Sequence, residues 1–578
     1  MTEPYLPEGS SPDQPIAPGP STETVPGRGR RRTVWVAAAV AVVVLLGGAA
    51  FAAYTVLSGG GPRPADVLPS STVAVLSVDL DPAAGQKVAA FRALRKVPEL
   101  KTRLASADDD LRRLVVDALT NGGSCKGLNY DADVKPWLGK RAAVAAVDLG
   151  DDRPAPALVL QITDKQKAAA GYRKFAACAD VGPEKAGYAL GEDYLIASDS
   201  TAHAAKILSD GKAKPLADDA TYQEWTDAAG GKGVVGFYVA HRATDYLVTE
   251  LEKLDKQFGG LAGITSGGLG TDSFDPQDFN PEDLGLDDSA YSGGAGRSAP
   301  AAEQKCDQDS ANPLASVKKA VAGFQGLAGS VRFAGSGLQV SVVAGGVRST
   351  RSTAVAGAQV GSLPRGTALA AGFGVPKTFA ADAVSSIAGC ASVLGVDPVA
   401  SLEALVGLKL PEDLATLLGS GVSIAVSGGQ PAGTAFDAIP YGVVVHGDGP
   451  AIKALVPKVE QSVGVSLADV PLLLTSSADK ASLSNSADYG KTLLSSGTLG
   501  SSEVFKDVVP DASRAGGVLF VDLAAGARDL IITEAGKAGA SAADLTRLRD
   551  YTTPLRAVGI STWVDGSGSH LLLKVTTN

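Results

Sequence analysis

One uncharged stretch near the N-terminus constrains this chain more than any other part of its sequence. Residues 33–57 read TVWVAAAVAVVVLLGGAAFAAYTVL. As a helix they would extend for roughly 37 Å, which is enough to cross a hydrocarbon core of about 30 Å. Positions 28–32 hold four arginines, whereas the first cation after the stretch is Arg63. Because positive charge favours the cytoplasmic side, we predict a single-pass transmembrane helix with a cytoplasmic N-terminus and an extracytoplasmic C-terminal body.

A cleavable signal peptide is the alternative interpretation of this stretch. Residues 50–52, Ala-Phe-Ala, would be its small-residue cleavage site. The apolar run continues past that site through Tyr54 to Leu57, which favours an uncleaved anchor in the cell membrane. No cysteine follows the run directly, since the first is Cys125, so a lipoprotein is disfavoured. We therefore expect the chain to contact the lipid bilayer through residues 33–57.

The composition around the predicted span indicates a folded, acidic body. Residues 1–32 are rich in Pro, Ser and Gly, as in a disordered cytoplasmic tail, and residues 58–66 resemble a flexible stalk. Hydrophobic residues make up 45% of the sequence, which suffices for packed cores beyond the stalk. The formal net charge of −10 argues against nucleic acid as a partner, because phosphate contacts need clustered Lys and Arg.

The four cysteines point to disulfides rather than to a metal or redox site. Cys125, Cys178, Cys306 and Cys390 show no CxxC spacing, so neither a zinc knuckle nor a thioredoxin-type site is indicated. Outside the cytoplasm one or two disulfides are expected, and three full pairings remain open. We favour one bridge among the first three cysteines, with Cys390 then a buried free thiol.

The first half of the body mixes strand and helix patterns. Strands are predicted over 72–80, 141–149, 156–162, 188–197 (one or two strands) and 233–240, and helices over 86–105, 108–121, 165–178, 202–209 and 244–258. Hairpins dominate the strand connections, which indicates antiparallel pairing. We predict an α+β fold in which a mostly antiparallel sheet carries packed helices on one face.

The second half repeats this order of patterns. LPSSTVAVLSV from Leu68 is echoed by LPRGTALAAGF from Leu363, and GFYVAHRATDYL from Gly236 by LFVDLAAGARDL from Leu519. Matching segments of the two halves are about 285 residues apart in the chain, and this spacing is too long for a solenoid repeat. We therefore predict two similar tandem domains, namely a first repeat over 67–347, a linker over 348–361 and a second repeat over 362–578.

A shorter offset between the Gly-Ser-Gly turns at 335–337 and 566–568 places an insert in the first repeat. Residues 259–311 are rich in Gly, Asp and Ser and are expected to form a mobile loop. Its carboxylates would suit calcium, but their spacing does not match an EF-hand, and a solvated loop is the preferred interpretation. These acids are Asp272, Asp275, Asp278, Glu282, Asp283, Asp287 and Asp288.

No motif in the sequence identifies a catalytic, metal or cofactor site. His203, His241, His446 and His570 lack HxxxH or HExxH spacing, and no GxSxG, phosphate-loop or dinucleotide motif is present. Residues 316–319 and 477–480 fit the loose SxxK pattern of serine–lysine enzymes. The SDN and KTG elements that accompany SxxK are absent, although Lys491-Thr492 comes near the latter. We accordingly name no catalytic residue, metal ligand or cofactor.

The order of these features resembles a family of bacterial single-span membrane proteins known as domain of unknown function 3352. The resemblance rests on LPSSTVAVLSVDLDPAAGQK from Leu68 and on DVKPWLGKRAAVAAVD from Asp133, and it would cover about residues 65–578. These motifs are structural, and the family has no assigned activity, so the resemblance implies no site residue.

The sequence favours a non-enzymatic binding or scaffold module of the cell envelope. Its partner would be an envelope protein, a glycan or a lipid. Two alternatives stay open, namely an extracytoplasmic hydrolase with an unrecognised site and a carrier of an apolar ligand held between sheet and helices.

Overall fold

The computed structural model describes the chain from Pro62 onward, with gaps. The described residues are 62–79, 112, 128–178, 187–231, 233–258, 318, 322–334, 337–346, 353–388, 398–431, 434, 436–463 and 471–578. Of the predicted helix at 108–121 only Arg112 is described, and the predicted tail, span, acidic insert and helix at 86–105 lie outside the described residues. So do Cys125, Cys306 and Cys390, and no disulfide prediction is tested. Within the described residues, no helix is both long and apolar enough to cross a membrane.

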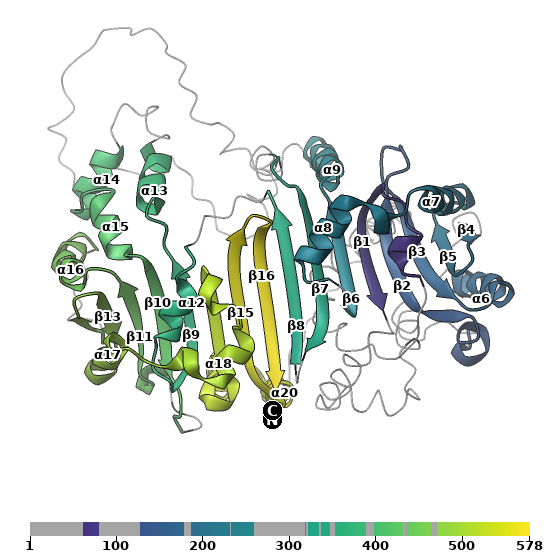
Figure 1. Ribbon diagram of the computed structural model, residues 1–578. Helices are drawn as coiled ribbons and strands as arrows, with labels where there is room; N and C mark the ends of the chain where they lie inside the picture. Colours follow the sequence, from purple (N-terminus) through teal and green to yellow (C-terminus); the bar gives the residue numbers. More distant parts are fainter. Residues whose placement is uncertain are drawn as a thin grey trace, which may run out of the picture.

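Sixteen strands of the described chain pair into one antiparallel sheet (Figure 1). Those of the first half are β1 (Thr72–Asp79), β2 (Leu138–Val147), β3 (Ala155–Ile162), β4 (Gly187–Leu190), β5 (Tyr194–Ser198), β6 (Val235–Ala240), β7 (Gly326–Ala334) and β8 (Gly337–Gly345). Those of the second half are β9 (Thr367–Gly374), β10 (Gly421–Ser427), β11 (Tyr441–His446), β12 (Leu473–Ser476), β13 (Lys480–Ser484), β14 (Gly517–Asp522), β15 (Leu555–Asp565) and β16 (Gly568–Thr577).

The strand order is the same in both halves when each is followed inward from its own edge. It runs β4-β5-β3-β2-β1-β6-β7-β8 from one edge and β12-β13-β11-β10-β9-β14-β15-β16 from the other. Each strand of the first half therefore corresponds to the strand numbered eight higher, and their neighbours correspond as well. For example, β1 lies between β2 and β6, and β9 lies between β10 and β14. The two halves meet at β8 and β16, which lie side by side at the centre of Figure 1.

Helices fill the connections between strands. In the first half they are η2 (Pro64–Asp66), η3 (Tyr130–Val134), α6 (Lys165–Cys178), α7 (Thr201–Ala213), η5 (Leu216–Asp218), α8 (Ala220–Ala228) and α9 (Ala243–Phe258). In the second half they are α12 (Ala356–Gly361), α13 (Phe379–Ala388), α14 (Pro398–Val406), α15 (Glu412–Leu418), η10 (Phe436–Ala438), α16 (Gly449–Val463), α17 (Ala487–Leu494), η12 (Leu499–Ser501), α18 (Glu503–Val508), η13 (Ala512–Arg514), η14 (Leu523–Ala527), α19 (Arg528–Lys537) and α20 (Ala542–Thr552).

The predicted α+β class and antiparallel pairing are confirmed, and the predicted helix over 165–178 coincides with α6. The sequence reading missed α8, whose start is marked by Asp219, since this side chain accepts the N–H of Tyr222 as an N-cap. Trp225 then anchors α8 in the core, where it is 5% exposed.

The prediction that helices cover one face of the sheet is wrong, because both faces carry them. In the first half, α7 and α8 bury Ile207 and Trp225 against Val75, Val159 and other residues of one face. On the opposite face, α6 and η3 bury Tyr172 and Tyr130 against Leu160 and Leu195. Neighbouring residues of a strand point to opposite faces, so a strand that is apolar on both sides, such as β5, needs cover on both.

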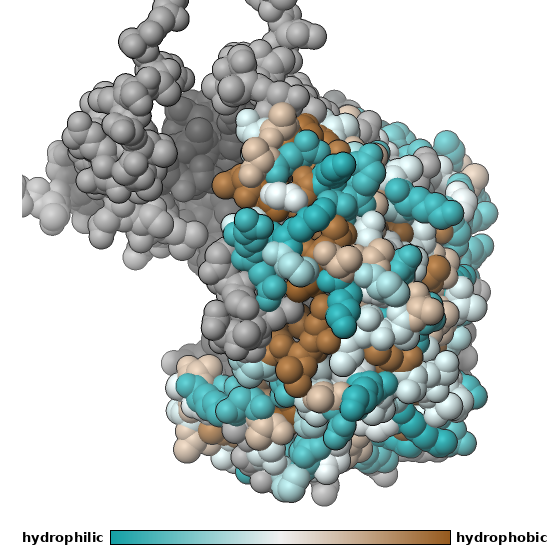
Figure 2. Space-filling view, turned by 90° about the vertical axis from the view of Figure 1, so that its left-hand side faces the viewer, coloured by the Kyte–Doolittle hydropathy of each residue, from teal (hydrophilic) through white to brown (hydrophobic). Residues whose placement is uncertain are grey.

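Part of the face opposite α12 and α18 remains apolar and accessible. The register of β9, β14, β15 and β16 places Phe373, Gly517, Thr562 and Leu571 in one row across four strands. Phe373 is 50% exposed and Leu571 is 38% exposed. Figure 2, viewed from the side of the second half, shows hydrophobic residues gathered in a vertical band with hydrophilic residues around it. Exposed large hydrophobic residues of this half include Phe373, Phe379, Leu405, Ile424 and Leu473.

Two turn glycines allow the two halves to approach each other at the centre of the sheet. Gly337 begins β8 beside the carbonyl of Val575, and Gly568 begins β16 beside Ala344. A Cβ added at Gly337 would overlap the Val575 oxygen, and one added at Gly568 would lie 2.5 Å from the Ala344 oxygen. Gly568 also has φ of 135°, a value that side chains disfavour.

We expect Gly568→Ala to destabilise the fold by about 2 kcal/mol, because it adds backbone strain to a steric clash at the β8–β16 junction. Gly566→Ala is the matched control, since a Cβ there meets nothing within 4 Å and its φ is not positive. Urea unfolding of both variants would measure the difference. Equal midpoints for the two variants would contradict the close approach assigned to Gly568.

Candidate functional site

Ser423 of β10 and His446 of β11 form a buried polar pair. His446 Nε2 lies 3.1 Å from Ser423 Oγ, and the two residues are 9% and 0% exposed. Lys480 of β13 lies opposite His446 in the ladder and is also buried. Burial lowers the pKa of His446 to about 4, the charge of Lys480 acts in the same direction, and Asp479 opposes them. The imidazole is therefore neutral at pH 7, and the pair stabilises the core where a substrate has no access.

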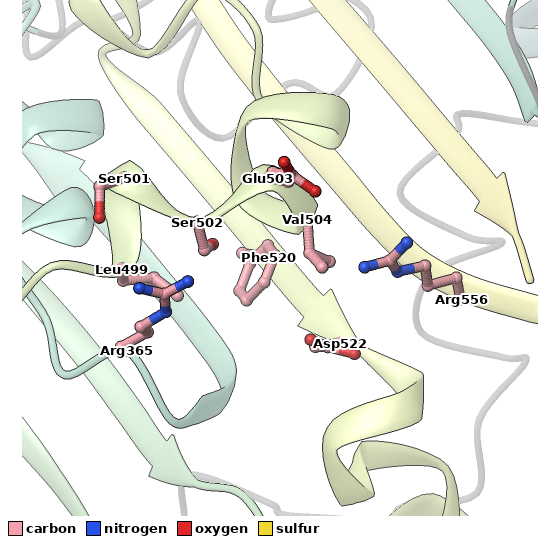
Figure 3. Close-up of a pocket in the computed structure, with 9 residues that line it drawn as sticks. All are labelled: Arg365, Leu499, Ser501, Ser502, Glu503, Val504, Phe520, Asp522 and Arg556. Carbon is pink, nitrogen blue, oxygen red and sulfur yellow. The ribbon is translucent and has the colours of Figure 1, made fainter.

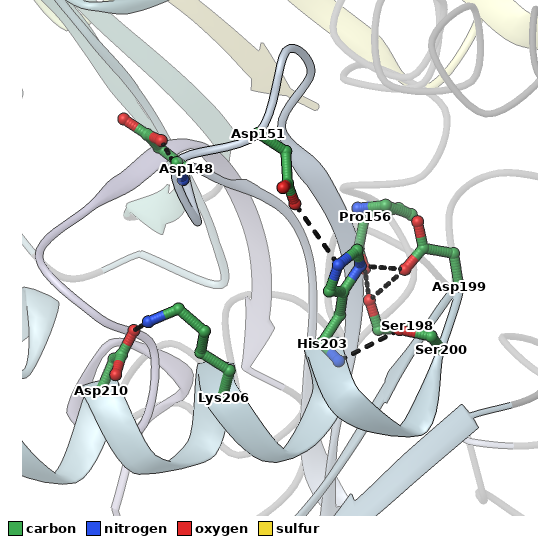
Figure 4. Close-up of polar contacts among 10 residues, drawn as sticks. Asp148, Asp151, Pro156, Ser198, Asp199, Ser200, His203, Lys206 and Asp210 are labelled. Carbon is green, nitrogen blue, oxygen red and sulfur yellow. Dashed lines mark hydrogen bonds and ion pairs between the residues drawn. The ribbon is translucent and has the colours of Figure 1, made fainter.

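His203 of α7 lies between two carboxylates (Figure 4). Its Nδ1 is 2.6 Å from Asp199 Oδ1, and its Nε2 is 3.3 Å from Asp151 Oδ2 in the loop between β2 and β3. The Ser198 hydroxyl donates to the carbonyl of Pro156 at 2.6 Å and lies 3.2 Å from Asp199 Oδ1, and neither contact is with the histidine ring. The cluster ties the β2–β3 loop to the start of α7.

His570 stabilises the turn between β15 and β16. Its ring stacks on Trp563 with centroids 4.8 Å apart, and Arg514 lies 4.0 Å above the centre of the same indole. His570 Nε2 is 2.9 Å from Asp565 Oδ1. Burial alone would raise the pKa of Asp565, but hydrogen bonds from Ser567 and contact with His570 outweigh it and hold the pKa below its usual value. His241 is exposed just after β6.

The SxxK residues that the structure describes do not form a serine–lysine site. Ser477 Oγ lies 2.9 Å from Asp479 Oδ1, and the Ser477 N–H donates to the carbonyl of Lys480, so the motif is a hairpin turn between β12 and β13. Lys491 of α17 pairs with Asp488 at 3.5 Å. Residues 316, 317 and 319 and all acids of the 259–311 insert lie outside the described chain. Among the described residues, no three His, Cys, Asp or Glu side chains meet in an arrangement suited to a metal ion.

A cavity of about 410 Å³ lies on the face of the sheet that carries α12 and α18 (Figure 3). Phe520 of β14 and Leu499 of η12 are 1% exposed and form its floor. We call this cavity the arginine pocket, because two arginines enter it from opposite sides of Phe520 (Figure 3). Its lining is Arg365, Leu499, Ser501, Ser502, Glu503, Val504, Phe520, Asp522 and Arg556.

Local backbone structure directs both arginines into the pocket. Arg365 lies in the turn between α12 and β9, which is held by the Thr367 hydroxyl donating to the carbonyl of Pro364 at 2.8 Å. Arg556 is the extra residue of a bulge in β15, since Leu555 pairs with Thr577 and Ala557 already pairs with Thr576. Bulges redirect side chains at the margins of sheets, and Arg556 extends toward Val504 of α18 (Figure 3).

Neither guanidinium group has a protein partner within the described part of the chain. Arg365 is exposed and Arg556 is half-buried, and no hydrogen bond or ion pair joins either of them to a described residue. A guanidinium group offers five N–H donors in a planar fork suited to carboxylates and phosphates. The arginine pocket thus combines unused donors with an apolar floor.

The sequence reading did not single out Arg365 or Arg556. One usable signal existed, because the repeated Leu-Pro turn carries Ser70 in the first half and Arg365 in the second. A guanidinium group offers donors suited to carboxylates and phosphates, whereas the hydroxyl at the first turn does not carry a charge. Arg556 gave no local signal, since the bulge that directs it depends on pairing with β16.

Comparison with known proteins gives a match to a family that carries no function. Residues 36–186 match the family model described as Protein of unknown function (DUF3352). This is the family that the sequence resembles, and the match spans β1 to α6, a shorter range than the resemblance was expected to cover. No curated protein and no solved structure matches the chain.

We expect His446 to make the stability of the fold depend on pH. Its pKa of about 4 in the folded state lies below the ordinary value of 6.5, so the unfolded chain binds the extra proton between these values. The stabilisation is complete above pH 6.5 and is lost as the pH falls toward 4, by about 3 kcal/mol at most. The difference in unfolding free energy between the protein and His446→Gln should shrink over this range. A difference that stays constant from pH 7 to 4.5 would contradict the assignment.

Proposed function

We propose that this chain is a membrane-anchored extracytoplasmic protein that binds a ligand without catalysing a reaction. One observation carries the binding role, namely that Arg365 and Arg556 enter a shared cavity with no protein partner of their own among the described residues. If Arg556 had only a structural role, its half-buried guanidinium group would be expected to pair with a carboxylate or a carbonyl of the protein. A ligand with acidic groups supplies that partner.

The proposed anchor and orientation rest on the sequence before the described residues. The uncharged stretch 33–57 is long enough to span a bilayer, and the arginines at 28–32 favour a cytoplasmic N-terminus. The body would then lie outside the membrane, where an envelope protein, a glycan or a lipid is within its reach. Its net acidity disfavours nucleic acid as the partner.

We further propose that the body arose by tandem duplication. The equal strand order of the two halves supports this, and so do equivalent local contacts. The Thr72 hydroxyl donates to Pro69 as that of Thr367 donates to Pro364. Ser200 and Ser486 cap the corresponding helices α7 and α17. The arginine pocket has no counterpart at the first Leu-Pro turn, where Ser70 stands in place of Arg365, so the two halves would have diverged in function.

The apolar-ligand carrier remains the second candidate function. The row that contains Phe373 and Leu571 is uncharged and partly accessible, and Ile424 and Val564 on the same face are 41% and 45% exposed. Lipid that co-purifies with the protein and is displaced by Phe373→Asp would favour this candidate. For a hydrolase we find no supporting arrangement among the described residues.

We expect the full-length chain to remain in the membrane pellet after alkaline carbonate extraction, because residues 33–57 would be held by the hydrocarbon core. A variant lacking residues 33–57 should appear in the soluble fraction. Protease added to intact cells should remove the C-terminal body, provided that the outermost barrier has been permeabilised. Full protection of the body under these conditions would contradict the proposed orientation.

We expect native mass spectrometry of the full-length chain, purified gently from its own host, to show a retained ligand. Arg365→Ala/Arg556→Ala should lose the extra mass with little change in stability, since neither side chain has a described partner. Arg153→Ala/Lys212→Ala is the charge-matched control, because both side chains are exposed and also lack described partners. A clean apo mass for the parent, or equal retention in both variants, would count against the binding role of the pocket.

A further inference from the structure

The charges around the arginine pocket alternate in sign. Arg365 and Arg556 flank Phe520, while Glu503 and Asp522 also line the pocket and lie above and below Phe520 in the view of Figure 3. The four side chains sum to no net charge at neutral pH. A site that selects a simple anion would surround it with cations alone, since each nearby carboxylate repels it. The balance instead complements a ligand that carries both signs.

The two carboxylates have free capacity to accept hydrogen bonds. Asp522 Oδ1 accepts the N–H groups of Ala524 and Ala525 at 3.1 and 3.0 Å, which caps the turn that follows β14. Its Oδ2 atom has no described partner, and Glu503 forms no hydrogen bond or ion pair with a described residue. Each group can therefore accept an ammonium N–H at no cost to the protein's own structure.

The floor of the pocket between these charges is apolar. Phe520 and Leu499 are buried, and Val504 of α18 is half-buried beside them. The cavity of about 410 Å³ falls at the small end of ligand sites. Strands β9 and β15 lie on either side of β14, so these two strands are about 10 Å apart, and Arg365 lies in the turn that leads into β9 while Arg556 lies in β15. This leaves room for a short, extended molecule with charged ends and an apolar middle.

We propose that the arginine pocket binds a zwitterion of the amino-acid or short-peptide class. Its carboxylate would pair with Arg365 or Arg556, its ammonium group with Asp522 or Glu503, and its apolar part would rest on Phe520. This inference rests on the proposed binding function and specifies the ligand of the same pocket. Guanidinium–carboxylate pairing is bidentate and directional, so a ligand whose ends are blocked loses the contacts that orient it.

Calorimetry on the full-length chain in nanodiscs would test the inference with four probes. These are a mixture of dipeptides with free ends, the same mixture after N-acetylation, the same mixture after C-amidation, and inorganic phosphate. We expect the free dipeptides to bind and either blocked mixture to bind at least tenfold more weakly, while phosphate binds no better than the blocked mixtures. Arg365→Ala/Arg556→Ala should abolish binding of the free mixture, and Arg153→Ala/Lys212→Ala should leave it unchanged.

Asp522→Asn separates recognition of the ammonium group from folding, because an asparagine oxygen can still cap the turn at 524–525. We expect this variant to weaken binding of the free dipeptides and to leave the weak binding of the N-acetylated mixture as it was. One result would overturn the zwitterion inference, namely that phosphate and the N-acetylated mixture bind as tightly as the free mixture and that all three depend on the two arginines. The pocket would then be an anion site, and the proposed binding function would stand. If no probe binds and native mass spectrometry finds no arginine-dependent ligand, both are overturned.

Discussion

The ladder between β8 and β16 is the interaction on which the architecture of this protein depends. Eight residue pairs, from Ser569 with Ala344 to Thr576 with Gly337, join two halves that otherwise have the same strand order. Without this ladder, β8 and β16 would each be an exposed edge strand, and exposed edges invite pairing with other chains. Glycine at positions 337 and 568 lets the two backbones approach closely at both ends of the junction. The sheet therefore extends continuously across the molecule, and its free edges are the short strands β4 and β12.

Burial on both faces of this sheet then determines which polar groups remain available. Ser423 and His446 lie in the core, His203 joins a loop to a helix, and His570 completes a turn, so each of these histidines has a structural role. The arginine pocket differs because it is lined by residues of β14, β15 and α18, and the guanidinium group of Arg556, like that of Arg365, has no described partner of its own. Unused donors next to an apolar floor are a property that folding alone does not require.

Much of the fold could be predicted because its signals are local. Alternation of apolar residues located β1 and β3, and the helical period located α6. The prediction of a single helical layer was wrong because β5 is buried at every position and therefore needs helices on both faces of the sheet. A continuous apolar run in the sequence does not indicate which helix covers which face. Helix α8 was missed because its nine residues are held by Trp225 and an N-cap rather than by a long amphipathic pattern.

By itself the sequence determined the α+β class, the antiparallel pairing and the repeated order of elements, because these follow from periodicity and from turn residues within short windows. Only the tertiary structure decided that the two halves share one sheet, that helices cover both faces, and that Arg365 and Arg556 meet in one pocket. The physical reason is that each of these depends on register between distant strands. Arg365 and Arg556 are brought together by β14 lying between β9 and β15, and a bulge visible only in the pairing with β16 turns Arg556 toward the cavity.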